Sequence, residues 1–82
     1  MTAKEMFEEM KLYQDNTDGI EYWEDSYAPE TFGFLGADVK FGFYEKDFDG
    51  EKIRTFYTRD NQITDYQLDA IIQQAKELGW ID

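Results

Sequence analysis

The sequence predicts a single α+β domain, residues 1–82. It would be built as two layers, with an antiparallel three- to four-stranded sheet and N- and C-terminal helices packed on one of its faces. Two observations favour this fold. Both ends of the chain carry a helix-capping signal followed by apolar residues at helical spacing, and the middle alternates between apolar and polar residues as half-buried strands do. The connections are short, which favours antiparallel neighbours because parallel strands need a long crossover.

The first predicted element is a short helix, roughly residues 3–11. Thr2 and Glu5 stand at the spacing of a capping box, in which each side chain binds a backbone N–H of the other end of the first turn. The apolar residues that follow recur at helical steps and would form one buried face: Ala3, Met6, Phe7 and Met10.

The predicted sheet begins after a turn. Thr17-Asp18-Gly19 is typical of a turn with positive φ, and residues 20–27 follow as a candidate strand that ends before Pro29. Alternation would place Ile20, Tyr22 and Glu24 on one face and Glu21, Trp23 and Asp25 on the other.

Three further segments complete the middle of the chain. Residues 31–35 and 39–45 alternate as strands, the second with Val39, Phe41 and Phe43 on one face. Asp47-Phe48-Asp49-Gly50 forms a tight turn into a last strand over residues 51–58. Two short helices can cover only one sheet face, so the other meets solvent or a partner, and it would carry Trp23, Tyr44 and either Phe56 or Tyr57.

The C-terminal helix carries a start signal, an apolar stripe and a stop signal. Thr64 and Gln67 form a second capping box, and Gly79 is placed to take the left-handed conformation that ends a helix, with Trp80 folding back over the last turn. The stripe that would face the sheet consists of Leu68, Ile71, Ile72, Ala75 and Leu78.

Composition narrows the function. The chain has neither cysteine nor histidine, so disulfides, thiolate chemistry and the commonest general base are excluded, and no cofactor is expected. Nineteen acidic residues against eight basic ones give a net charge of −11, which disfavours direct binding to nucleic acid or to anionic membranes and favours a basic partner. The alternative is that acidity only keeps an aromatic-rich protein in solution. Without a signal peptide or a long apolar run, we expect a cytoplasmic protein.

Two acidic stretches partly match a calcium loop. The spacing of Glu45, Asp47, Asp49 and Gly50 copies the opening of an EF-hand loop, but Phe56 stands where the closing acid belongs. The stretch from Gln14 to Gly19 fits less well, although Asp25 falls at its closing position. We therefore expect acidic turns and no metal site.

The distribution of charge is the most informative feature. Residues 12–39 contain no lysine or arginine but hold seven acidic residues, so one side of the protein should be strongly negative. Rows of carboxylates along a strand can substitute for backbone phosphates and occupy a basic groove. The predicted partner-binding residues are Asp18, Glu21, Trp23, Glu24, Asp25, Tyr27 and Glu30. The alternative is a solvated acidic edge that prevents aggregation.

The two ends of the chain also carry a resemblance. Residues 1–9, 63–72 and 76–80 resemble small acidic accessory proteins of Gram-positive bacterial phages and mobile elements. The resemblance implies a setting in which small acidic proteins often inhibit host defence or DNA-binding proteins, and it supplies no catalytic residues.

Two hypotheses of function follow, and neither is an enzyme. The first is an inhibitory binding protein that mimics nucleic-acid charge and occupies the basic surface of a nucleic-acid-binding or defence protein. The second is a generic protein–protein interaction module, or a homodimer that uses the aromatic sheet face not covered by helices. Salt dependence separates them, because charge mimicry weakens at high salt and apolar contacts persist.

Overall fold

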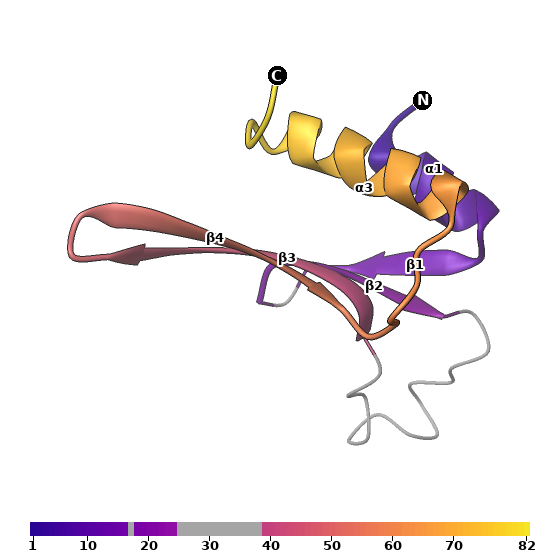
Figure 1. Ribbon diagram of the computed structural model, residues 1–82, viewed down its shortest axis with the longest axis horizontal. Coiled ribbons are helices and arrows are strands. Elements are labelled where there is room, and N and C mark those ends of the chain that lie inside the picture. Colours follow the sequence, from indigo (N-terminus) through magenta and orange to yellow (C-terminus); the bar gives the residue numbers. More distant parts are fainter. Residues whose placement is uncertain (17, 25–38) are drawn as a thin grey trace.

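The computed structural model describes residues 1–16, 18–24 and 39–82 and confirms the predicted α+β fold. Helix α1 (Ala3–Glu9) is followed by strands β1 (Leu12–Asp15), β2 (Ile20–Glu24), β3 (Val39–Phe48) and β4 (Glu51–Thr58) and by helix α3 (Asp65–Glu77). Both helices lie on the same face of the sheet, and both termini lie on that side (Figure 1). None of the helices in the described ranges is long and apolar enough to cross a membrane.

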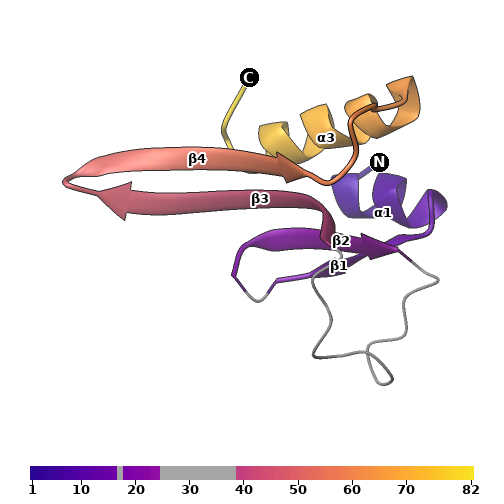
Figure 2. The same ribbon diagram turned by 60° about the horizontal axis from the view of Figure 1, so that its bottom comes forward.

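The four strands form one antiparallel sheet in the order β1-β2-β3-β4. Asp49 (φ 51°) and Gly50 (φ 82°) connect β3 to β4. Positive φ at both central residues defines the type I′ turn that suits a two-residue hairpin, so the predicted turn is confirmed. The β3–β4 hairpin extends well beyond the helices at one end of the molecule (Figure 2).

The strand bounds differ from the prediction in two places. Strand β1 was not predicted, because Leu12–Asp15 has four residues and only one buried side chain, which leaves no clear alternation. Strand β3 runs to Phe48 rather than residue 45, into the projecting hairpin where its side chains are exposed and alternation fades. The predicted strand over residues 31–35 and the end of the one over 20–27 lie outside the described residues.

The turn before β2 needs glycine for a different reason than predicted. Within the described residues, Gly50 and Gly79 have positive φ, but Gly19 does not. A Cβ on Gly19 would lie 2.6 Å from the Phe43 carbonyl oxygen and 2.7 Å from the Tyr44 ring. Gly19 therefore serves close packing of the turn against β3 rather than an unusual backbone conformation.

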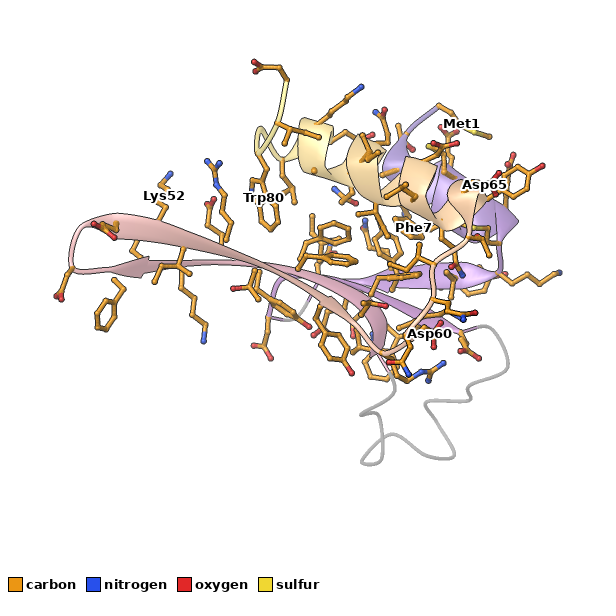
Figure 3. The ribbon with its side chains drawn as sticks, in the orientation of Figure 1. Met1, Phe7, Lys52, Asp60, Asp65 and Trp80 are labelled. Carbon is orange, nitrogen blue, oxygen red and sulfur yellow. The ribbon has the colours of Figure 1, made fainter. Side chains whose placement is uncertain are left out.

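The core lies between the helices and the sheet. It contains Ala3, Phe7, Leu12, Tyr22, Phe41, Phe43 and Ala70. The Phe7 and Tyr22 rings stack with centroids 3.9 Å apart, and Trp80 packs 6.0 Å from Phe43 at the end of α3. Figure 3 shows Phe7 between α1 and the sheet and Trp80 directed from the end of α3 toward the strands. Aromatic rings supply the buried area that so short a chain needs.

The buried face of α3 is rotated from the predicted stripe. Ala70 and Gln74 are buried, whereas Leu68 (49% exposed) and Ile72 (37% exposed) face outward. Small Ala70 lies in the core where α1 and α3 contact each other. The Gln74 side chain is tolerated inside because its Oε1 accepts a hydrogen bond of 2.5 Å from the Tyr22 hydroxyl. Ile71 and Leu78 of the predicted stripe do pack against the core, so the prediction is confirmed for them and is wrong for Leu68 and Ile72. A hydrophobicity pattern cannot anticipate a buried glutamine.

The predicted capping boxes and the glycine stop of the C-terminal helix are confirmed, whereas α1 ends at Glu9 rather than residue 11. Thr2 and Glu5 form a reciprocal capping box, as do Thr64 and Gln67. Gly79 has φ 77°. The Trp80 N–H donates to the Ala75 carbonyl and the Gly79 N–H to the Lys76 carbonyl, which is the hydrogen-bond pattern of a Schellman motif.

Candidate functional site

The sheet face opposite the helices, here called the far face, is the candidate site. Strand alternation and register assign to it Glu21, Gly42, Tyr44, Lys46, Phe48, Ile53, Thr55 and Tyr57. Phe56 instead belongs to the helix side, where its ring packs 5.1 Å from Phe43 and 6.1 Å from Phe41. Of the two aromatic residues that the sequence left open for this face, the register therefore selects Tyr57.

The far face is hollowed into a groove between the β1–β2 turn and the projecting hairpin. Its volume is about 760 Å³, and its lining residues are Asp18, Glu21, Tyr44, Lys46, Asp47, Phe48, Ile53 and Thr55. Phe48 is 67% exposed and Ile53 is 48% exposed. The lining therefore combines three carboxylates with one lysine and two exposed apolar side chains, which gives the groove a mixed, mainly acidic and apolar surface.

Tyr44 occupies the floor of the groove because two glycines leave room for its ring. A Cβ on Gly42 would lie 2.4 Å from the Tyr44 hydroxyl oxygen, and a Cβ on Gly19 would lie 2.7 Å from a ring carbon. Both distances are far below van der Waals contact, so any larger residue at either position would move the ring. An aromatic ring over a strand glycine restores the packing that glycine lacks.

The Tyr44 hydroxyl donates a hydrogen bond of 2.6 Å to Oε2 of Glu21. Loss of hydration, this hydrogen bond and the negative charges of Glu21 and Asp18 raise the pKa of Tyr44 to about 12. Tyr44 therefore stays protonated at neutral pH and holds the Glu21 carboxylate in place. The arrangement fixes one negative charge at a defined position in the groove.

Glu24 has a different environment. Lys40 lies 3.6 Å from its carboxylate, and the Arg59 guanidinium also contacts it. Asp60 completes the group through Lys40 at 3.0 Å and Arg59 at 3.8 Å. Figure 3 places Asp60 where the chain leaves β4. Residues 12–39 contain no lysine or arginine, but the fold places two basic side chains beside Glu24: Lys40 from β3 and Arg59, the residue after β4. These two cations offset the negative charge of Glu24.

The predicted partner-binding residues divide into three groups. Asp18 and Glu21 line the groove. Glu24 is ion-paired, and Trp23 lies beside a β-bulge opposite Val39, away from the groove lining. Asp25, Tyr27 and Glu30 lie outside the described residues. The structure adds Tyr44, Phe48 and Ile53 to the groove lining. The sequence had placed only Tyr44 on the sheet face away from the helices, and the general signal for the other two was that two short helices can cover only one sheet face.

The calcium-like stretch that begins at Glu45 forms a β-hairpin rather than a helix-flanked loop. The other stretch includes residues 17 and 25, which lie outside the described residues. Glu45 lies in β3 and binds Arg54 across the hairpin at 3.1 Å, while Asp49 and Gly50 form the turn. Within residues 1–16, 18–24 and 39–82, no three acidic side chains gather as a metal site would require.

Comparison with protein-family models, with curated proteins and with solved structures finds no significant match. The functional argument therefore depends on the groove itself.

Proposed function

We propose that this is a non-enzymatic acidic binding protein whose far-face groove engages a basic, partly apolar surface of a partner protein. The observation that carries the proposal is the placement of Asp18 and Glu21 in the same groove as the exposed Phe48 and Ile53. Cationic side chains of the partner would approach the carboxylates, and apolar side chains beside them would cover Phe48 and Ile53. Interfaces commonly combine an apolar centre with charges that steer association in this way.

The net charge of −11 indicates the class of partner. A nucleic-acid-binding protein has the basic surface that such a charge attracts, and occupying that surface would inhibit it. The absence of cysteine from the sequence is consistent with action in the cytoplasm. Inhibition by mimicry of nucleic-acid charge is the specific form of this proposal.

The contacts of Glu24 limit how such mimicry would work. Lys40 and Arg59 already offset the charge of this carboxylate. The proposal therefore does not rest on a continuous row of uncompensated acids along β2. Asp18 and Glu21 in the groove support it instead, since Glu21 is held in position by Tyr44. The mimic would then present fixed charges beside an apolar surface rather than a simple line of charge.

Affinity capture from a bacterial lysate, followed by competition, tests this function. Immobilised protein should retain a basic partner at about 50 mM salt and release it at about 500 mM, because exposed charges are screened over about 10 Å at 0.1 M. Duplex DNA added at low salt should displace the same partner if the contacted surface binds nucleic acid. Retention that is insensitive to both salt and DNA would contradict the proposal and favour an apolar interaction module.

The apolar module remains as a second candidate because of specific exposures. Phe48, Ile53 and Tyr57 all belong to the far face and are 67%, 48% and 42% exposed. Replacing Phe48 with serine should abolish binding by such a module at every salt concentration. An acid-directed partner would lose only part of its affinity.

A further inference from the structure

The outer edge of β4 is the second feature of the molecule that invites a partner. The sheet order ends at β4, and within the described residues no other strand pairs with its outer edge. Residues 51–57 are all exposed. An edge strand of this length presents a row of backbone donors and acceptors that a further strand can use.

The hairpin geometry fixes which backbone groups face outward. Because Asp49 and Gly50 form a two-residue turn, Phe48 and Glu51 are a hydrogen-bonded pair. Hydrogen-bonded and non-hydrogen-bonded pairs alternate along an antiparallel ladder. Ile53 and Thr55 therefore direct their N–H and C=O groups to β3, and the outward groups belong to Lys52, Arg54, Phe56 and Thr58.

We propose that β4 pairs antiparallel with β4 of a second copy about a two-fold axis at Thr55. A two-fold axis perpendicular to the sheet keeps each face on its own side, so residues that oppose each other must share a face. In this register the opposed pairs are Thr55 with Thr55, Arg54 with Phe56, Ile53 with Tyr57 and Lys52 with Thr58. Thr–Thr pairs and aromatic–β-branched pairs are favourable across strands, and arginine lies well over an aromatic ring.

Charge selects this register over its neighbours. An axis at Arg54 would place the two Arg54 side chains opposite each other, and an axis at Ile53 would place Lys52 opposite Arg54. Like charges directly opposed destabilise a ladder. An axis at Phe56 avoids this repulsion but shortens the ladder to residues 54–58. The axis at Thr55 gives the longest ladder, from Lys52 to Thr58, without opposed like charges.

The dimer would carry both grooves on the same side of one continuous sheet, since the axis is perpendicular to it. Each copy brings a net charge of −11, so overall repulsion opposes association. Salt should therefore strengthen the dimer while it weakens binding to a basic partner. The two behaviours have opposite signs, so failure of one proposal does not imply failure of the other.

Cysteine trapping tests the register, because the chain has no cysteine of its own. Thr55→Cys would place two thiols in a non-hydrogen-bonded pair about 4.5 Å apart between Cα atoms, which is within disulfide range. Under air oxidation we expect Thr55→Cys to form a covalent dimer. Ile53→Cys alone should form no covalent dimer, because Ile53 opposes Tyr57 in this register, whereas Ile53→Cys mixed with Tyr57→Cys should give a covalent mixed dimer. Equal trapping of Thr55→Cys and Ile53→Cys would overturn the register.

Sedimentation equilibrium tests the association itself without a new thiol. The unmodified protein at about 10 μM to 1 mM should show a dimer that is favoured by salt. Thr55→Lys should raise its dissociation constant about fivefold or more, because the two lysines would meet at the axis. Tyr66→Lys makes the same change of charge on α3, at a side chain that is 76% exposed, and should leave the dimer intact. A protein that stays monomeric to 1 mM in high salt would overturn the proposal.

Discussion

The hydrogen bond between Tyr22 and Gln74 should stabilise the fold in a way that a double-mutant cycle can measure. Tyr22 is 0% exposed and Gln74 is 3% exposed. The Tyr22 hydroxyl donates to Gln74 and accepts from the Gln14 side-chain amide at 3.0 Å. This chain of groups connects β1, β2 and α3 inside an otherwise apolar layer, so each member depends on its neighbour for a partner.

The expected magnitudes follow from the cost of an unpaired buried polar group. Gln74→Leu leaves the Tyr22 hydroxyl without its acceptor, and Tyr22→Phe leaves the Gln74 amide without its donor. Each single change should cost about 1–3 kcal/mol of unfolding free energy. The double variant replaces both partners with apolar groups of similar shape, so it should cost no more than either single variant, which gives a coupling of about 1–3 kcal/mol.

Urea denaturation followed by circular dichroism measures these free energies of unfolding. If the dependence of the unfolding free energy on urea concentration is the same in every variant, the substitutions change stability alone. Gln73→Leu is the matched control because the neighbouring glutamine bonds to Glu77 at an exposed position, and it should change stability by less than about 0.5 kcal/mol. Additive costs in the double variant would refute the reasoning, because they would mean that the two side chains do not share a buried hydrogen bond.

Three further changes test single features. Gly79→Val should cost about 1–2 kcal/mol in thermal unfolding because Gly79 has φ 77°, and unchanged stability would exclude that conformation. Tyr44 has a folded pKa of about 12 against an ordinary 10.0, so its contribution to stability is complete below pH 10 and is lost as pH rises toward 12. Tyr44→Phe should remove one late-ionising tyrosine from an absorbance titration, and an unchanged late phase would contradict this. Gly42→Ala should displace the Tyr44 ring and return its ionisation toward pH 10; retention of the raised pKa would show that the ring does not rest on Gly42.

The elements that the sequence predicted well are those with local causes. Both capping boxes and the Asp49-Gly50 turn depend on residues within one turn of each other. Strand β1 has no such local signature, since Leu12–Asp15 becomes a strand by pairing with β2. The rotation of α3 was also hidden, because Gln74 becomes compatible with the core only when Tyr22 lies opposite it.

The candidate site shows the same division. Acidic residues could be counted in the sequence, so Asp18 and Glu21 were among the predicted contacts. Their environments could not be predicted, because the pairing of Glu24 with Lys40 and Arg59 joins residues brought together only by the sheet. Tyr44 was expected on the sheet face away from the helices, but its support by Gly19 and Gly42 needs the fold.

The central claim is that the acids of the groove, rather than net charge alone, direct binding, and one comparison of affinities tests it most directly. The probe is a fluorescent peptide of alternating arginine and leucine, measured by anisotropy from about 20 to 300 mM salt. One variant carries Asp18→Asn with Glu21→Gln in the groove. Its matched control carries Glu8→Gln with Glu9→Gln, which removes the same charge from exposed positions on α1. The groove variant should bind about fivefold or more weakly with a flatter salt dependence, and the control should change less than about twofold. Equal losses in both variants, or no loss in either, would contradict the claim.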